Sequence, residues 1–176
     1  MCFSAQVEQR YRTYVRRFGA DIDIAEFVRR YGMRLDDPKV KLPRGMDLAF
    51  LDDDTPTLEP IRVLIRQWEQ AKATLLEREL FGQRKRVADA ERALSTKVTK
   101  KAQEDVRIGT AKAETAQRKL GELKRSEPKA RDSRIFPGVD ALVLIVRDNT
   151  PTVLPMRYQC RPAGKPVSYD TRYPGT

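Results

Sequence analysis

The chain has 176 residues, enough for about one domain with a buried core, and its 40% hydrophobic and 34% charged residues are typical of a polar globular protein. No apolar run approaches the 18 residues of a membrane-spanning helix, and the start shows no secretory signal, so we expect no membrane association. Two cysteines without a CxxC pair, and no histidine, exclude a disulfide framework and a common zinc site, so we expect no metal, no cofactor and a reducing, cytoplasmic location.

The net charge of +10 and the pI near 9.8 favour a polyanionic partner, with nucleic acid the first candidate. The basic excess is concentrated in one segment. Residues 58–134 hold 20 Lys/Arg and 12 Asp/Glu, a net charge of +8, whereas the rest of the chain has a net charge of only +2.

Two short helices are predicted first. Hydrophobic residues at helical spacing predict an amphipathic helix over Ser4–Phe18, with its first residue as N-cap and Gly19 as its end. Asp23 then has the position of an N-cap, and Glu26 three residues later completes a capping-box pattern. Gly32 is expected to end this second helix.

Residues 36–57 are rich in proline and aspartate and predict irregular structure with a short strand at Asp47–Leu51. From Leu58 to about Glu127, Ala, Glu, Lys, Arg, Gln and Leu dominate, which predicts long exposed helices. Two apolar stripes with a turn at Phe81–Gly82 indicate an antiparallel hairpin about 30–50 Å long.

The second arm of this expected hairpin carries two basic patches, Arg84–Arg86 and Lys97, Lys100 and Lys101. The segment is interpreted either as a solvated coiled coil, whose charges keep it in solution, or as a nucleic-acid contact surface. A coiled coil formed between two chains fits the pattern as well as an internal hairpin does.

A β-hairpin is predicted next. Asp140–Arg147 is an almost continuous apolar run, Asp148–Pro151 is a turn signal, and Thr152–Cys160 is expected to be the returning strand. Residues 161–176 are expected to form a loop. The predicted class is therefore α+β, and because a two-stranded sheet is not stable alone, we expect the β core to be incomplete in this chain.

Cys2 is the first candidate for chemistry. Removal of Met1 would leave Cys2 with a free α-amine beside its thiol, a 1,2-aminothiol that no internal cysteine has. The thiolate is the nucleophile, and the pKa values of about 8.5 and 7.7–8.0 leave both groups partly deprotonated near neutral pH. Such a pair can attack a carbonyl and close a thiazolidine ring. The alternative is an ordinary second residue without a function.

Two stretches together resemble the SOS-response-associated peptidase (SRAP) family of abasic-site processing proteins. The opening Met1–Val7 (MCFSAQV) is similar to family members that begin with Met and a reactive Cys, and Pro155–Pro162 (PMRYQCRP) stands where the family has a Met-Arg-Trp strand. Tyr169–Thr176 leads towards the family's Asn-Ala-Arg motif. Departures are Phe3–Ser4 in place of Gly-Arg, Tyr158 in place of Trp, and the absence of the family's later Asn, Glu and His.

The resemblance implies three segments: residues 1–56 as the first part of an SRAP-like, mainly antiparallel β domain, residues 57–131 as a helical insertion, and residues 132–176 as its β-hairpin and loop. It implies that the protein senses abasic sites in single-stranded DNA, in the DNA-damage (SOS) response. Cys2 would form a thiazolidine crosslink with the lesion. It also implies autoproteolytic release of Met1, peptidase activity, and association with the nucleoid when DNA is bound.

DNA binding requires phosphate neutralisation and a stacking surface for unpaired bases. Arg157 and Tyr158 are the best candidates, and Arg161 and Arg172 are weaker ones. Because adjacent strand residues point to opposite faces, Arg157 and Tyr158 can both contact DNA only where the strand is bent or at an edge. The alternatives are a surface charge for Arg157 and a core aromatic for Tyr158, and Cys160 is expected to be a buried strand cysteine.

Two other classes of function remain open: a non-catalytic nucleic-acid-binding protein that uses the basic hairpin, and a coiled-coil scaffold that self-associates. A papain-like thiol protease is the least favoured class, because it needs a histidine partner and the chain has none.

Overall fold

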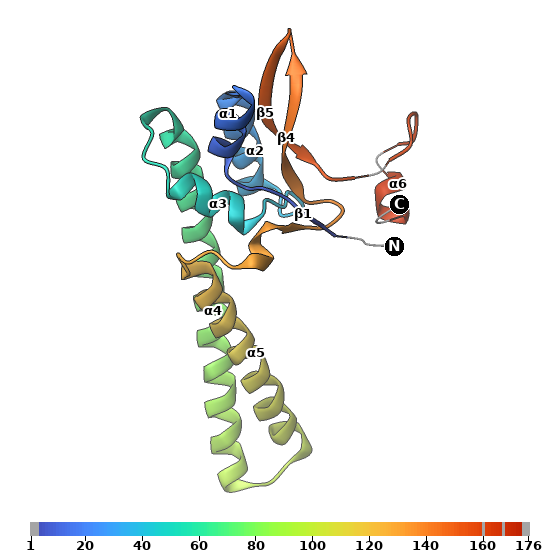
Figure 1. The fold of residues 1–176 in the computed structure, drawn as a ribbon. Helices are drawn as coiled ribbons and strands as arrows, with labels where there is room; N and C mark the ends of the chain where they lie inside the picture. Colours follow the sequence, from blue (N-terminus) through green and yellow to red (C-terminus); the bar gives the residue numbers. More distant parts are fainter. Residues whose placement is uncertain (1–3, 160, 167, 174–176) are drawn as a thin grey trace. The chain divides into compact units, whose positions relative to one another are not determined.

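The computed structural model describes residues 4–159, 161–166 and 168–173, and it is an α+β protein with small sheets and two long helices (Figure 1). The chain forms two compact units. The core unit comprises residues 1–67 and 127–176, and the helical unit comprises Trp68–Ser126.

The N-terminal segment begins as a strand. Strand β1 is Ala5–Gln6, and helix α1 starts only at Tyr11 and runs to Phe18. The helix predicted from Ser4 is therefore wrong in its first half, because Ala5 and Gln6 pair with a distant strand and this pairing outweighs the local helical spacing. Gly19 ends α1 as predicted: it has a φ of 58°, and its N–H donates to the Val15 carbonyl.

Strand β2 (Asp21–Ile22) leads into helix α2 (Ile24–Asp36). Asp23 is the N-cap, as predicted, and its carboxylate accepts from the Glu26 N–H at 2.9 Å. The capping box is not closed, because the Asp23 N–H donates to the carbonyl of Val153 instead. The prediction that Gly32 ends α2 is wrong: burial of the flanking residues Tyr31 and Arg34 carries the helix to Asp36.

Helix α3 (Arg44–Leu51) replaces the strand predicted at Asp47–Leu51. Met46 and Phe50 lie four residues apart and are both buried, which is the spacing of one helical face. Asp47 is also buried. Because a charged residue is not expected in a core, the sequence does not show that Met46, Asp47 and Phe50 form one buried helical face. A 3-10 turn, η1 (Pro56–Leu58), connects α3 to the long helix that follows.

The predicted β-hairpin is confirmed. Strands β4 (Asp140–Arg147) and β5 (Thr150–Arg157) are antiparallel, with Arg147 opposite Thr150. The turn is tighter than predicted, because Asp148 and Asn149 alone form it, with φ values of 48° and 61°. Cys160, expected at the end of β5, lies outside the described residues.

Two further pairings complete the sheets. Strand β2 pairs parallel to β5, which gives the order β2-β5-β4, and β1 pairs antiparallel to β3 (Arg134–Ile135). The short η2 turn (Ala130–Ser133) precedes β3. Helix α6 (Ser168–Arg172) lies in the segment that was expected to be a loop.

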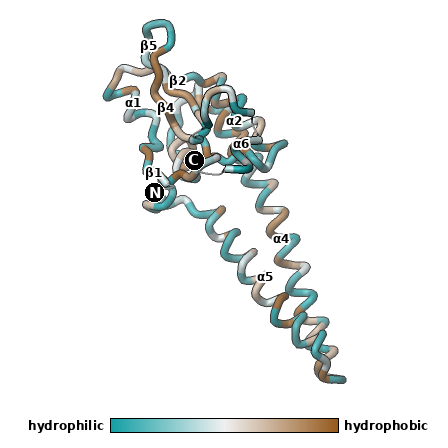
Figure 2. Tube along the Cα trace, turned by 90° about the vertical axis from the view of Figure 1, so that its right-hand side faces the viewer, coloured by the Kyte–Doolittle hydropathy of each residue, from teal (hydrophilic) through white to brown (hydrophobic). Residues whose placement is uncertain are grey.

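The core of this unit lies between α1, α2, α3, the start of the next helix and the sheet. Phe50 is at its centre and contacts three rings: Tyr11 stacks on it with centroids 5.6 Å apart, and Phe27 and Tyr31 meet it edge-on. Val153 of β5 is fully buried in the same cluster. Figure 2 shows hydrophobic residues concentrated along β4 and β5, whereas α5 is largely hydrophilic.

Helices α4 (Glu59–Thr96) and α5 (Lys100–Lys124) form the antiparallel hairpin. The turn predicted at Phe81–Gly82 is wrong, because α4 continues through Gly82, at a cost of about 1 kcal/mol relative to Ala. The reversal occurs at residues 97–99, where the Thr99 hydroxyl caps α5 by accepting from the Ala102 N–H at 3.2 Å. The patch Arg84–Arg86 therefore lies on the first arm of the hairpin.

A small core joins the two arms: Ala73 and Leu76 of α4 are buried with Leu120 of α5. No helix in the described part of the chain has both the length and the apolar character to cross a membrane.

Candidate nucleic-acid interface

The candidate site is the end of strand β5. Arg157 is its last residue and faces Asp140 across the hairpin. The ladder continues one step further, because the Tyr158 N–H donates to the Val139 carbonyl and the Gly138 N–H donates to the Tyr158 carbonyl, both at 2.8 Å. Within the described residues, β2 pairs only with Thr152 and Val153 of β5, so β4 is the one neighbouring strand of β5 where Arg157 and Tyr158 lie.

Gly138 gives the Arg157 side chain its room. Gly138 has a φ of 87°, which disfavours any residue with a side chain, and a Cβ there would lie 3.4 Å from Arg157 Nη2. The guanidinium therefore lies over the Gly138 backbone. Arg157 is exposed and Tyr158 is half-buried, so the aromatic ring keeps a partly open surface next to a cation.

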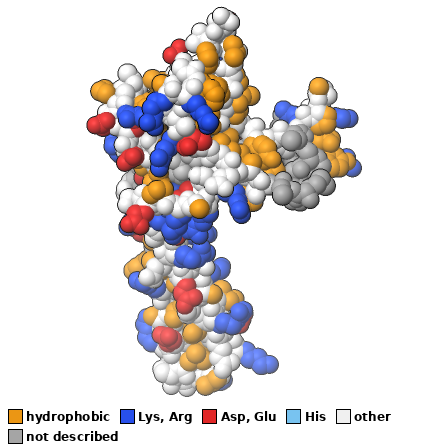
Figure 3. Space-filling view, in the orientation of Figure 1, with side chains coloured by type: hydrophobic (Ala, Val, Ile, Leu, Met, Phe, Trp, Pro, Cys, Tyr) orange, Lys and Arg blue, Asp and Glu red, His pale blue; other side chains and the backbone are white. Residues whose placement is uncertain are grey.

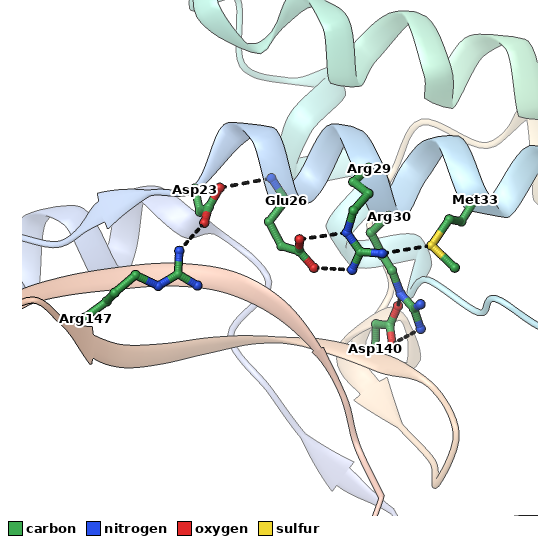
Figure 4. A network of polar contacts seen from close by, with 7 residues as sticks. All are labelled: Asp23, Glu26, Arg29, Arg30, Met33, Asp140 and Arg147. Carbon is green, nitrogen blue, oxygen red and sulfur yellow. Dashed lines mark hydrogen bonds and ion pairs between the residues drawn. The ribbon is translucent and has the colours of Figure 1, made fainter. Parts of the chain in front are cut away.

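Asp140, the residue opposite Arg157, is not available as its counter-ion. The Asp140 carboxylate is fully buried and both of its oxygens are bound by Arg30 of α2: Nη2 donates to Oδ1 at 2.9 Å and Nε donates to Oδ2 (Figure 4). These hydrogen bonds raise the pKa of the Arg30 guanidinium. Within the described part of the chain, Arg157 has no hydrogen bond or ion pair and is free to bind a phosphate.

A second group of charges lies along α2 (Figure 4). Asp23 accepts from the Glu26 N–H and from Arg147 Nη1 at 2.7 Å, and Arg29 binds Glu26 through two hydrogen bonds. The backbone hydrogen bond from Glu26 and then the Arg147 contact lower the pKa of Asp23. These pairs attach α2 to the end of β4 and leave no carboxylate in the group unpaired.

Two more buried carboxylates are also bound to arginine. Asp47 accepts from both Nη atoms of Arg34, at 2.8 and 3.0 Å, and from the Tyr31 hydroxyl at 3.0 Å. Burial raises the pKa of Asp47, and the Arg34 charge opposes that shift. For Asp53, hydrogen bonds led by the Tyr11 hydroxyl outweigh burial and lower the pKa.

Each of these buried carboxylates is thus paired with an arginine inside the core unit. A search of the residues that the structure describes finds no group of three Asp, Glu or Cys side chains that could hold a metal ion.

The weaker candidates Arg161 and Arg172 are both associated with α6. Arg161 Nη1 lies 3.5 Å from Asp170 Oδ2, and the Arg172 guanidinium lies 5.8 Å from the centre of the Tyr173 ring. Tyr173 in turn contacts Tyr169, with centroids 4.7 Å apart. Sequence reasoning missed this aromatic pair, although its i, i+4 spacing beside Arg172 was a usable signal.

Cys2 lies outside the described residues, so the structure gives no geometry for the proposed nucleophile. Residues 5–7 are the first of the described residues with backbone pairings in the structure. Ala5 and Gln6 pair with Ile135 and Arg134, and the Val7 N–H donates to the Ser133 carbonyl at 2.9 Å. Residues 5–7 are thus hydrogen-bonded to residues that follow the helical unit in the sequence.

Comparisons with known proteins give no relative: no family model, no curated protein and no solved structure matches the chain.

Proposed function

We propose that this protein is a variant of the SRAP family that senses abasic sites in single-stranded DNA and binds them covalently through Cys2. The observation that carries the proposal is the pairing of β1 with β3. It joins the segment after Cys2 to the segment before the β-hairpin, so the two stretches that carry the resemblance belong to one folded unit.

The chemistry follows from the aminothiol. After release of Met1, the α-amine of Cys2 attacks the aldehyde of the ring-opened abasic sugar, and loss of water gives a Schiff base. The Cys2 thiol then adds to the imine carbon, and its proton passes to nitrogen as the thiazolidine closes. One water is released in total. The product is a stable DNA–protein crosslink.

The free cation Arg157 and the half-buried Tyr158 support binding of the DNA strand. A guanidinium binds a phosphate through two N–H donors, and an aromatic ring stacks on an unpaired base whatever its identity. Cys2 is three residues from Ala5, and an extended chain spans at most about 3.3–3.6 Å per residue. Capture through Cys2 therefore has to occur within about 11 Å of β1.

The test is a crosslinking assay with an oligonucleotide that carries one abasic site. We expect a shifted band on a denaturing gel for the natural protein and none for Cys2→Ala. The Cys2→Ser protein keeps the amine but lacks the thiol, so its Schiff base should survive denaturation only after borohydride reduction. Mass spectrometry of the natural protein should show that Met1 has been removed.

A crosslink that persists in Cys2→Ala without reduction, or the lack of any band from the natural protein, would falsify the proposal. Arg157→Gln is expected to slow crosslinking at low DNA concentration and to leave the saturated rate unchanged. This result separates strand binding from the covalent step.

A second candidate function, non-catalytic nucleic-acid binding, is supported by the helical unit. Residues 68–126 hold 15 Lys/Arg and 9 Asp/Glu, a net charge of +6. In that case the Cys2→Ala protein keeps its full affinity for single-stranded DNA, and no covalent species forms with either protein.

A further inference from the structure

An open groove of about 540 Å³ lies between α4 and α5, close to the connection of the two helices. Four of its lining residues are small: Gly82, Ala90, Ala93 and Ala102. Gly82 has nothing within 4 Å of where a Cβ would stand, so a side chain at this lining position would enter open space. Figure 3 shows Lys and Arg side chains along the surface of the helical unit.

The charges around this groove are unequally paired. Asp105 is bound by Arg86, whose Nε donates to it at 3.0 Å, and Asp89 is bound by Arg92 at 2.6 Å. Lys85 and Lys101 also line the groove and are exposed, and within the described ranges neither has a hydrogen bond or an ion pair. Both acids are thus neutralised, and two lysines remain without a counter-ion.

The position of Lys101 increases this imbalance. Lys100 and Lys101 lie in the first turn of α5, which contains no acidic residue. The N-terminal end of a helix carries about half a positive charge, so a cation there interacts unfavourably with the helix dipole, whereas an anion interacts favourably. Two lysines lie at this end of α5, and a bound anion would offset their repulsion from the helix dipole.

We propose that this groove binds the phosphodiester backbone of single-stranded DNA, with Lys85 and Lys101 contacting phosphates on its two sides. The assignment of the polyanion as single-stranded DNA rests on the proposed function. The groove is a second DNA contact, formed entirely within the helical unit, and it involves neither Cys2 nor the end of β5. It gives the inserted helices a role in holding the strand.

The test uses the whole protein and an oligonucleotide without any abasic site, so that no crosslink can form. Fluorescence anisotropy measures the affinity of Lys85→Gln/Lys101→Gln between 50 and 300 mM salt. Each phosphate contact on a single strand contributes about 0.7 to the slope of log affinity against log salt concentration. We expect the slope to fall by about 1.4, which corresponds to about 25-fold weaker binding at 0.1 M salt.

The matched control is Lys72→Gln/Lys119→Gln. These lysines are exposed, lie on the same two helices and do not line the groove, and Lys119 is about 27 Å along α5 from Lys101 at 1.5 Å per residue. The control removes the same net charge and should change the affinity less than threefold. Equal losses for the two double variants would overturn the proposal in favour of diffuse attraction.

A second pair of variants tests the groove without removing a lysine. Gly82→Glu and Gly82→Gln place side chains of the same size in the groove, and both favour helix formation. We expect Gly82→Glu to bind single-stranded DNA at least fivefold more weakly than Gly82→Gln, and equal affinities would contradict the proposal. Because this DNA carries no lesion, a failure here leaves the Cys2 chemistry intact, and a Cys2 failure leaves the groove intact.

Discussion

Asp23 connects two elements of the core unit with a single side chain. Its carboxylate caps α2 through the Glu26 N–H and binds Arg147 at the end of β4. Its backbone N–H donates to Val153 of β5. The N-terminal end of α2 is therefore attached to β4 and β5 through Asp23, and the contacts of its carboxylate depend on its charge.

Asp23→Ala is expected to lower the free energy of unfolding by about 1 kcal/mol, the usual cost of losing an N-cap. Asp23→Asn keeps a capping oxygen and should lose less. The pKa of Asp23 is lowered in the folded protein, so ionised Asp23 stabilises the fold above its unfolded pKa of about 3.9, and this contribution disappears as the pH falls through the folded value. Urea unfolding should show the natural protein and Asp23→Asn converging between pH 7 and pH 3. A constant difference over that range would show that the charge has no role.

At the scale of elements, the sequence predicted correctly those helix ends and strands that depend on interactions between residues close together in the chain. The start of α2 depends on a capping oxygen, the end of α1 on a glycine with positive φ, and the β4–β5 hairpin on an apolar run beside a turn signal. All three signals can be read within a few residues of the sequence. Strand β1 depends on a partner about 130 residues away, which no local pattern reveals.

Buried charge explains the wrong prediction at α3. Helix α3 was mistaken for a strand because Asp47 interrupts its apolar face, and Arg34, thirteen residues earlier, compensates that charge. The candidate site was affected in the same way. The sequence pointed to Arg157 and Tyr158. It could not show that Arg30 binds the Asp140 carboxylate, which would otherwise be the natural ion-pair partner of Arg157 across the hairpin.

The two glycines of α5 are predicted to respond oppositely to the same substitution. A Cβ on Gly109 would lie 2.7 Å from Cγ2 of Val87 on α4, whereas a Cβ on Gly121 would meet nothing within 4 Å. Gly121→Ala should therefore stabilise the protein by about 0.5–1 kcal/mol through helix propensity. Gly109→Ala should be at least about 1 kcal/mol less stable than Gly121→Ala, because the two helices must separate.

Chemical denaturation followed by circular dichroism measures both variants. Val87→Ala removes the methyl group that a Cβ on Gly109 would meet. In a protein that already carries Val87→Ala, adding Gly109→Ala should therefore destabilise the fold much less than it does in the natural protein. If Gly109→Ala is as stable as Gly121→Ala, the close approach of α4 and α5 at this position is wrong.

At the scale of the whole molecule, the two units differ in how much they bury. Among the described residues, the core unit has one cluster that includes the fully buried Phe27 and Val153, and it connects α1, α2, α3 and the start of α4 with the sheet. The cluster of the helical unit has three buried residues, Ala73, Leu76 and Leu120, at one end of the hairpin. The opposite end, around the groove, buries mainly alanine and glycine.

Amide hydrogen exchange should report this difference directly. Protection follows the free energy of local opening, which is lowest where few apolar contacts form. We expect α2 and β5 to exchange slowest and residues 82–105 to exchange at least tenfold faster. Single-stranded DNA should slow exchange over residues 82–105 in the natural protein and in Lys72→Gln/Lys119→Gln, but not in Lys85→Gln/Lys101→Gln. Protection by DNA that is confined to the core unit would show that the helical unit does not hold the strand, because a ligand stabilises only the parts whose folded form it binds.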